Sequence, residues 1–468
     1  MNRQQKIQMA PLDAMWRVME SHQTPMHVGV LAQFKIPPRA AEGYMEELAE
    51  YLRSFNRPVY PWNQRWSAGP DFVARFEKIR DFGIEEHFRH HALPKPGGER
   101  QLGRLVSRLH SIALGPNSAL WEIHLIEGLE AHRFGVYLKV HRALARGITA
   151  VPLLMSFLGD NPRKRKIKPF WTIAHTFDQA SGEEESVSWH SQGANDLLRS
   201  TTRIGRDLFR SVQNPREAAS FLLPGKTPRS TLNRKINHQR RIATQQFGIQ
   251  RLTRLAEAAD SCIEDILMYL CGTALRRFFM EYNALPTESL IAGVPVELHD
   301  EDELGPSNAI AGLRLSLNTH LGDAQERLEA IKGSMRSLRE EVENLPHHAV
   351  APYTFTRSLP IYGSQLPVVG SLVPPLFNLS ISGIVAGPKH PVFLRGARLE
   401  ALYSLNVLMQ HSALSIDVIR YGDTLNVALT GARDTLPRLQ RIAVYMGRAL
   451  DDLEKLYTLV DGGLREEH

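Results

Sequence analysis

Apolar and polar residues alternate in two segments of the first third of the chain, with the period of two that is typical of a β-strand. In residues 26–34 every second side chain is apolar, namely Met26, Val28, Val30, Ala32 and Phe34. Residues 133–140 alternate in the same way and run directly into His141, and an apolar segment of helical length follows over residues 148–158. The pattern predicts a half-buried strand at 26–34 and a turn at 141–147 between a buried strand and a buried helix. Such connections often hold catalytic side chains.

Helical periodicity predicts several further elements. They lie at residues 12–21, 40–55, 197–223, 260–282, 324–343 and 436–456. Alternating apolar residues on both sides of the Tyr-Gly-Asp-Thr sequence at 421–424 predict a β-hairpin over residues 414–429.

Strands and helices in mixed order indicate an α/β (α+β) fold, with mixed sheets flanked by helices. The chain has 468 residues, about three times the ~150-residue prior for one domain, so we expect two or three domains. Residues 159–190 are polar, basic and then acidic, as is typical of a linker. We therefore predict an N-terminal lobe over residues 1–160, a basic linker and crossover helix over 161–225, and a C-terminal lobe over 226–468.

The composition is that of an ordinary globular protein, with 43% hydrophobic and 23% charged residues, which excludes a disordered or fibrous chain. Two cysteines, Cys262 and Cys271, exclude a disulfide scaffold and are typical of buried residues in a reducing compartment.

The N-terminus has no apolar signal sequence, so we expect a cytoplasmic protein. Residues 358–388 are apolar and uncharged, but their many prolines and glycines predict buried strand and loop rather than a membrane helix.

The net charge is +6, from 56 Lys and Arg against 50 Asp and Glu, and the basic excess is concentrated in two segments. Residues 162–168 carry five basic side chains, and residues 224–241 carry six and no acidic one. Both segments fit solvated loops and also fit contact with an anionic surface, such as phospholipid or a phosphorylated ligand. A peripheral position at a membrane or lipid-inclusion surface is a further expectation, at ~1 kcal/mol per basic residue. Nucleic acid is not expected, since no recognition helix or zinc spacing accompanies the charge.

Candidate chemistry is sparse in the sequence. No short motif of a metal site, a serine-hydrolase elbow or a phosphate-binding loop is present. What remains is His141, at the end of a predicted strand, which on its own fits a packed core residue and a general base equally well.

Many ordered segments match one family of proteins. They include Leu12-Asp13-Ala14, Thr24 to Gly29, Ala92-Leu93-Pro94, Leu120-Trp121-Glu122, Asn233, Ala274 to Arg277, Gly396 to Leu399 and Gly431 to Arg441. With these segments the chain resembles, nearly end to end, the bacterial wax ester synthase/acyl-CoA:diacylglycerol acyltransferases. This family belongs to the chloramphenicol acetyltransferase and condensation-domain superfamily.

The resemblance implies two chloramphenicol-acetyltransferase-like lobes, joined by a long crossover, with a tunnel between them. The implied partners are acyl-CoA as substrate, and a fatty alcohol or diacylglycerol as acceptor, with no cofactor or metal. It also implies an H-H-x-x-x-D-G motif, whose second histidine takes the proton from the acceptor hydroxyl as that oxygen attacks the thioester. Histidine suits this role because its ordinary pKa of ~6.5 lets it accept a proton at neutral pH.

The corresponding segment departs from the motif at two decisive positions. The first histidine is His141 and the final glycine is Gly147, but Arg142 stands at the base position and Arg146 at the aspartate position. Arginine has a pKa of ~12.5–13.8, so Arg142 is no base at neutral pH. Loss of a general base alone typically costs ~10²–10⁴-fold in rate. His141 does not simply replace it, because adjacent side chains leave the backbone in different directions.

The resemblance further implies a set of substrate-binding positions. They are Trp121, Asn233, Asn308, Asn378 and Ser382. Other family positions are altered here. Ala119 replaces a proline, Glu264-Asp265 replaces an Asn-Asp pair, and the segment from Ser382 to Pro388 lacks its usual asparagine.

Two hypotheses remain open on the sequence. The first is an acyltransferase that makes wax esters or triacylglycerol, with His141, His110 or His124 as a residual base. The second is a catalytically impaired paralogue that binds acyl-CoA or lipid, or modulates an active homologue at the lipid-droplet surface.

Overall fold

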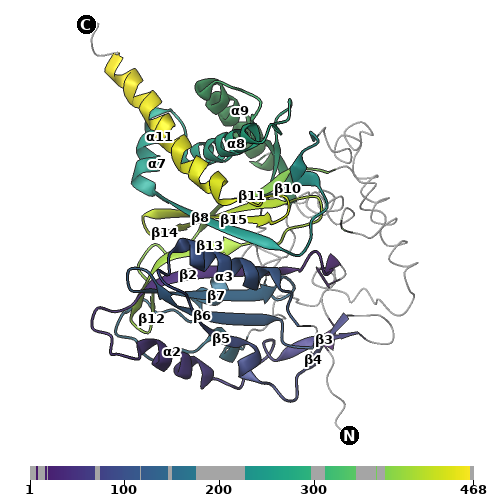
Figure 1. The fold of residues 1–468 in the computed structure, drawn as a ribbon, viewed down its shortest axis with the longest axis vertical. Coiled ribbons are helices and arrows are strands. Elements are labelled where there is room, and N and C mark those ends of the chain that lie inside the picture. Colours follow the sequence, from purple (N-terminus) through teal and green to yellow (C-terminus); the bar gives the residue numbers. More distant parts are fainter. Residues whose placement is uncertain are drawn as a thin grey trace.

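The chain folds around two six-stranded sheets, and in Figure 1 one sheet lies above the other. This computed structural model describes residues 7–8, 16–17, 19–68, 74–115, 117–145, 150–174, 227–296, 311–343, 365 and 375–463. Both sheets mix parallel and antiparallel neighbours. In the first, β5 (Phe88–Ala92) runs parallel to β6 (Trp121–Leu129), which runs antiparallel to β7 (Arg133–His141). In the second, β14 (Leu414–Tyr421) runs parallel to β11 (Leu379–Ala386) and antiparallel to β15 (Thr424–Ala432). The fold is therefore the predicted mixed α/β arrangement of two lobes.

The first sheet has the strand order β12-β13-β2-β7-β6-β5. Strand β2 (His27–Lys35) confirms the strand predicted over 26–34, and β7 confirms the one predicted over 133–140. The structure differs in one respect, because β2 is buried on both faces rather than half-buried. Helix α2 (Tyr44–Arg53) packs on one face, and helix α3 (Glu99–Ser111) covers the other, where the second lobe also contributes.

Two strands of this first sheet come from the C-terminal half of the chain. Strands β12 (Phe393–Leu394) and β13 (Ala397–Leu405) form its edge, and β13 pairs antiparallel with β2 over seven register pairs, from Arg398↔Lys35 to Leu405↔Gly29. This crossover of β12 and β13 into the first sheet joins the two lobes and places the end of β13 beside the start of β2.

The second sheet has the order β10-β9-β11-β14-β15-β8. Its strands are β8 (Arg240–Gly248), β9 (Ile291–Val296), β10 (Ala311–Ser316), β11 (Leu379–Ala386), β14 (Leu414–Tyr421) and β15 (Thr424–Ala432). The predicted hairpin over 414–429 is confirmed as β14 and β15, which pair antiparallel up to Tyr421↔Thr424. Strand β11 confirms a strand within the apolar segment 358–388, but it is buried only at Leu379, Ile381 and Ser382 and is partly exposed or exposed elsewhere. Residues 358–364 and 366–374 lie outside the described residues.

Helices cover the outer side of the second sheet, at the top of Figure 1. They are α7 (Ile249–Ala258), α8 (Ile263–Glu281), α9 (Ala324–Glu343) and α11 (Gln440–Gly463). The helices predicted at 260–282, 324–343 and 436–456 are thus confirmed. Helix α8 is buried along most of its length and contains the buried Cys271, whereas Cys262, just before it, is partly exposed.

The other predicted helices have mixed outcomes. Helix α2 confirms the one predicted at 40–55, and the helix predicted at 148–158 is the short α4 (Val151–Met155). The segment 197–223 lies outside the described residues, and so does most of the helix predicted at 12–21. Among the described residues, no helix is both long and apolar enough to cross a membrane.

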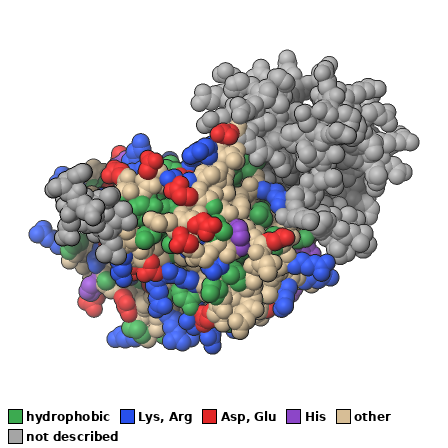
Figure 2. Space-filling view, turned by 90° about the horizontal axis from the view of Figure 1, so that it is seen from above, with side chains coloured by type: hydrophobic (Ala, Val, Ile, Leu, Met, Phe, Trp, Pro, Cys, Tyr) green, Lys and Arg blue, Asp and Glu red, His purple; other side chains and the backbone are tan. Residues whose placement is uncertain are grey.

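A small three-stranded sheet flanks the first lobe. It has the order β1-β4-β3 and consists of β1 (Ile7–Gln8), β3 (Gln64–Ala68) and β4 (Ala74–Lys78). On the face of the molecule shown in Figure 2, basic and acidic side chains of the described residues are interspersed. That face therefore presents no broad surface of a single charge.

Candidate active site

The turn that carries the predicted motif begins where β7 ends, at His141. The backbone N–H of Arg142 donates to the carbonyl of Met26 at 2.8 Å, and the N–H groups of Leu144 and Ala145 donate to the carbonyl of His141 at 2.9 and 3.2 Å. The turn is therefore bound to the start of β2. Arg146 and Gly147, which complete the motif, lie outside the described residues.

The imidazole of His141 is buried and committed to this turn. Its Nδ1 accepts a hydrogen bond from the backbone N–H of Ala143 at 3.1 Å. In the neutral ring the proton is then on Nε2, which lies 3.7 Å from Oε1 of Glu20. The edge of the ring meets the Trp66 ring at a centroid distance of 5.2 Å. With its lone pair engaged by Ala143, His141 fixes the shape of the turn.

The contact with His141 affects the pKa of Glu20. Burial favours its neutral form, but the polar contact and the charge of His141, with the N–H of Met26, outweigh burial and hold the pKa of Glu20 below its ordinary value. Glu20 therefore remains a carboxylate facing the turn.

Arg142 is buried as well, with 2% of its surface exposed. Its guanidinium lies over the ring of Trp16, 5.0 Å from the centroid, and Nη1 donates to the carbonyl of Ala145. A guanidinium suits this place because it combines stacking on an aromatic face with hydrogen bonds in its own plane. At the position of the motif's base, this chain holds a cation that binds the carbonyl of Ala145 within the turn and stacks on Trp16.

A polar band leads from the turn toward the second lobe. Nε2 of His27 lies 2.9 Å from the carbonyl oxygen of His110, at the end of α3. Nε2 of His110 lies 3.4 Å from the carbonyl of Asn406, and its Nδ1 lies 2.7 Å from the hydroxyl of Tyr137. Burial, with the charge of Arg240, lowers the pKa of His110 to about 3. His110 is therefore neutral, with both ring nitrogens occupied.

The band ends at a buried carboxyl group of the second lobe. Asp417, on β14, accepts hydrogen bonds from Nδ2 of Asn406 at 3.3 Å and from the hydroxyl of Ser415 at 3.0 Å. Burial raises its pKa to about 7, against which these hydrogen bonds act only in part. Sequence reasoning missed Asp417 and Asn406, although an acidic residue within the buried strand Leu414 to Ile419 was an available signal.

A second buried polar cluster surrounds Glu122 on β6. Lys139 lies 2.8 Å and His124 3.3 Å from its Oε2, while Nδ1 of His124 lies 3.0 Å from Nε2 of His91. Burial would raise the pKa of Glu122, but the hydrogen bond of His124 and the charge of Lys139 outweigh it and lower the pKa to about 2. His124, like His110, thus has both ring nitrogens engaged.

Comparison with known proteins shows which family has this architecture. The family model described as wax ester synthase/diacylglycerol acyltransferase catalytic domain matches residues 9–267, and the WS/DGAT C-terminal domain matches residues 307–454. The chain belongs to this family. A putative diacylglycerol O-acyltransferase of Mycobacterium tuberculosis is 33% identical over 95% of this chain and 96% of its own, and an O-acyltransferase of Acinetobacter baylyi is 31% identical over 93% and 94%.

Solved structures agree with the family assignment. The wax ester synthase/diacylglycerol acyltransferase of Marinobacter aquaeolei is 30% identical and superposes with a TM-score of 0.78, over 97% of this chain and 100% of that one. The first condensation domain of the calcium-dependent antibiotic synthetase superposes with a TM-score of 0.55 at 14% identity, which shows a shared fold. The predicted membership in the wax ester synthase/diacylglycerol acyltransferase family, and the two-lobed fold, are thus confirmed.

Within this wax ester synthase/diacylglycerol acyltransferase fold, the predicted substrate-binding positions do not gather at one place. Trp121 is buried, donates from Nε1 to the carbonyl of Trp62 at 2.8 Å and stacks on Trp171 at 5.1 Å. Ser382 accepts from the backbone N–H of Val418 at 2.9 Å. Both side chains contribute to packing and to backbone contacts. Their predicted role in binding substrate stays a prediction.

Asn233 and Asn378 do meet. Nδ2 of Asn378 donates to Oδ1 of Asn233 at 2.7 Å, and both amides also bind backbone groups, including the carbonyl of His411 and the N–H of Ile291. The pair fixes the chain before β8 against the start of β11. Asn308 lies outside the described residues.

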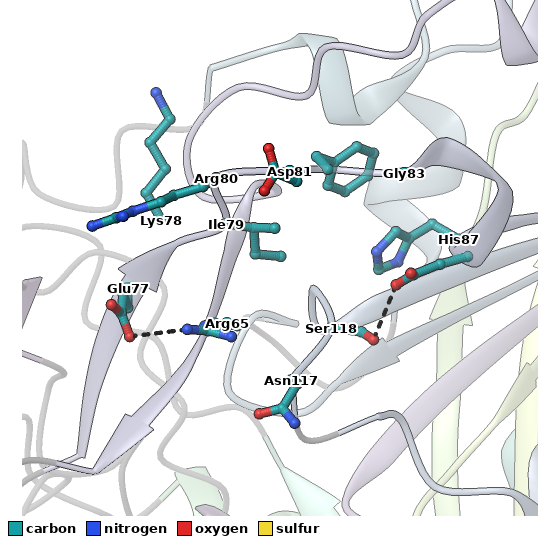
Figure 3. Close-up of a pocket in the computed structure, with 12 residues that line it drawn as sticks. Arg65, Glu77, Lys78, Ile79, Arg80, Asp81, Gly83, His87, Asn117 and Ser118 are labelled. Atoms are coloured by element: carbon teal, nitrogen blue, oxygen red, sulfur yellow. Dashed lines mark hydrogen bonds and ion pairs between the residues drawn. The ribbon is translucent and has the colours of Figure 1, made fainter.

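A cavity of about 700 Å³ opens beside the β3–β4 hairpin (Figure 3). Its charged lining is balanced, with Arg65, Lys78 and Arg80 against Glu77, Asp81 and Glu86. Arg65 lies 3.6 Å from Glu77, and the Ser118 hydroxyl is 3.5 Å from Glu86. None of the predicted site residues that the structure describes lines this cavity.

Proposed function

We propose that this chain transfers an acyl group from acyl-CoA to the hydroxyl of a fatty alcohol or a diacylglycerol. The observation that carries the proposal is the likeness to the Marinobacter enzyme, which extends over 97% of this chain at a TM-score of 0.78. The two relatives reported above, whose names describe O-acyltransferases, match almost the whole chain as well. Acyl transfer from a thioester requires a hydroxyl, a group that takes its proton and exclusion of water, and it calls for no metal or cofactor.

Proton transfer is the step for which the residues of this chain depart from the motif that the family resemblance implies. Arg142 remains protonated at any physiological pH and is engaged with Ala145 and Trp16. The lone pair of His141 is engaged by Ala143. Proton transfer therefore requires either rearrangement of this turn or another group close to it.

The decisive experiment is a direct assay of the purified chain with palmitoyl-CoA and either hexadecanol or a dioleoylglycerol. Release of CoA thiol and formation of the ester are followed together, because thiol release alone also reports hydrolysis. We expect ester to form in proportion to thiol, above the level given by heat-inactivated protein. Saturable binding of palmitoyl-CoA without ester would instead favour the impaired paralogue, which binds acyl-CoA or modulates an active homologue.

We also infer contact of the chain with an anionic lipid surface through residues 162–168. Basic side chains in this segment are exposed, and the segment is held in place because Nη1 of Arg165 donates to the carbonyl of Arg395. Exposed lysines beside an anionic leaflet contribute ~1 kcal/mol each.

Cosedimentation with vesicles of phosphatidylserine and phosphatidylcholine tests this contact. Lys166→Gln/Lys168→Gln removes two exposed charges from the segment, and Lys78→Gln/Lys389→Gln removes two exposed charges elsewhere. We expect the first pair to weaken binding at low salt more than the second. Equal binding of both double variants, or no binding by the unmodified chain, would contradict the proposal.

A further inference from the structure

The buried imidazole of His27, at the start of β2, has a tautomer fixed by its surroundings. Nε2 lies 2.9 Å from the carbonyl oxygen of His110. A carbonyl oxygen only accepts hydrogen bonds, so Nε2 carries the proton. In the neutral ring, the lone pair is then on Nδ1.

This lone pair has no partner. Nδ1 of His27 is buried and receives no hydrogen bond, and the side chain as a whole is 2% exposed. Folded proteins leave few buried polar atoms unsatisfied, and those that remain call for an explanation such as a catalytic role.

The neighbouring imidazoles show how unusual this is. Nδ1 of His141 accepts from Ala143, His110 is occupied at both nitrogens, and His124 is occupied by Glu122 and His91. Of these four buried histidines, His27 alone keeps an open lone pair.

His27 also lies at the right place. It is the register partner of His141 across the β2–β7 pair, so it stands beside the motif turn. The preceding residue, Met26, packs with Trp16 in a cluster that includes Val407 and Met409, which follow β13. The chain that leaves β13 and returns to the second lobe thus passes this point, where the two lobes meet.

The charges around His27 keep it neutral. Burial lowers its pKa well below the ordinary value, and the positive charges of Lys139 on β7 and Arg240 on β8 act in the same direction. The lone pair is therefore open throughout the neutral pH range. The same effects make the ring a weaker base than an ordinary histidine, and a proton on Nδ1 therefore passes readily to a stronger base.

We propose that Nδ1 of His27 is the proton acceptor for acyl transfer in this chain, in place of the motif histidine that Arg142 replaces. The inference rests on the proposed function. The acceptor hydroxyl gives its proton to Nδ1 while its oxygen forms a bond to the thioester carbonyl carbon. The carbon–sulfur bond breaks, and the CoA thiolate takes the proton from Nδ1 and leaves as the thiol. The ring returns to its neutral form, and no other reactant is consumed.

Two substitutions separate the base from the structural hydrogen bond. His27→Gln keeps a donor for the carbonyl of His110, namely the amide Nε2. The same substitution removes the lone pair at the δ position. His27→Asn lacks the longer reach and loses the bond to His110. His22→Gln, at an exposed histidine five positions away, is the matched control.

We expect His27→Gln to lower kcat by ~10²–10⁴-fold, while its KM for palmitoyl-CoA and its thermal midpoint stay close to those of the unmodified chain. His27→Asn should lose activity to a similar extent and stability in addition, and His22→Gln should change neither. Wild-type kcat in His27→Gln overturns the assignment. Absence of ester formation by the unmodified chain is a different result, because it overturns the proposed function itself.

A second measurement does not depend on turnover. Nitrogen-15 spectra of imidazole-labelled protein, with His27 assigned by its loss in His27→Gln, report which ring nitrogen is protonated. We expect a neutral ring with the proton on Nε2 across neutral pH. A proton on Nδ1 would remove the open lone pair and overturn the inference whatever the activity.

Discussion

His27 and His141 are register partners at the ends of β2 and β7, yet their Nδ1 atoms have opposite roles. Nδ1 of His141 accepts the backbone N–H of Ala143, whereas Nδ1 of His27 accepts nothing. Two adjacent strand ends thus present one imidazole that shapes the motif turn and one that is available for chemistry. The guanidinium of Arg142 then acts as a clamp within the turn, by binding the carbonyl of Ala145.

Restoring the family motif should raise activity. Arg142→His combined with Arg146→Asp supplies a neutral imidazole at the base position and a carboxylate at the aspartate position. We expect the rate of ester formation to rise, by as much as the ~10²–10⁴-fold that a general base contributes.

Arg142→Gln is the control for this gain, since it removes the same clamp from Ala145 without adding a base. If the new histidine takes over proton transfer, then His27→Gln in the restored background should cost far less activity than in the unmodified chain. A restored motif with no gain would show that the substrate path itself has changed.

The contact between Gly29 and Tyr137 predicts a sharp steric effect. A Cβ at Gly29 would lie 2.7 Å from the ring of Tyr137, whose hydroxyl is 2.7 Å from Nδ1 of His110. Gly29→Ala should displace the ring, weaken its bond to His110 and lower the free energy of unfolding by about 1–3 kcal/mol, as overpacking does.

Urea denaturation measures the effect, with Gly333→Ala in α9 as the control, because a Cβ there meets no atom within 4 Å. Alanine in an open helical position should stabilise the protein by about 0.5–1 kcal/mol. Equal stability of both variants would contradict the predicted clash.

The buried pair of Glu122 and Lys139 predicts a strong asymmetry between single and double substitutions. Glu122→Gln leaves the ammonium of Lys139, 1% exposed, without its carboxylate, which should cost about 3–5 kcal/mol in urea denaturation. Glu122→Gln/Lys139→Met removes both charges and should recover most of that loss. A double variant as unstable as the single one would show that the pair is favourable in itself.

The pKa of Glu122 sets the pH range of this contribution. It is lowered to about 2 from an ordinary 4.5, so the stability from this carboxylate is fully present above pH 4.5 and is lost as the pH falls toward 2. The difference between the unmodified chain and Glu122→Gln should therefore shrink in acid.

Much of the fold followed from local patterns, because alternation and helical periodicity depend only on neighbouring residues. Strands β2 and β7 and the hairpin of β14 and β15 are of this kind. The entry of β13 into the first sheet is not, since it depends on a pairing with β2 over more than 360 positions in sequence. The second face of β2 is covered by α3 and by second-lobe residues such as Ile242 and Ala428, so the strand expected to be half-buried is fully buried.

The candidate site was likewise predictable in its local part, the motif turn, and not in its long-range contacts. The family motif identified His141 and Arg142, and the structure places both in one buried turn. The open lone pair of His27 could not be predicted, because it depends on the carbonyl of His110, 83 positions away. Likewise, nothing local indicates that Asp417 meets Asn406 between the lobes.

The raised pKa of the buried Asp417 carboxyl predicts that the free energy of unfolding falls as the pH rises. Its pKa is raised from 3.8 to about 7 by burial, so the folded chain binds the proton more tightly than the unfolded chain does. The free energy of unfolding should therefore fall by up to ~1.4 kcal/mol per pH unit between about pH 4 and pH 7 on account of this group.

Asp417→Asn resembles the protonated form and should remove this dependence. The amide keeps an acceptor for Asn406, and the hydroxyl of Ser415 turns to accept from the new amide group. We expect the variant to match the unmodified chain near pH 4 and to exceed it by about 1–3 kcal/mol at pH 8, as measured by urea denaturation at both values. Asp423→Asn, in the exposed turn of the same hairpin, is the control and should show no pH-dependent gain. A gain from Asp417→Asn that is equal at both pH values would contradict a buried carboxyl that titrates near neutrality.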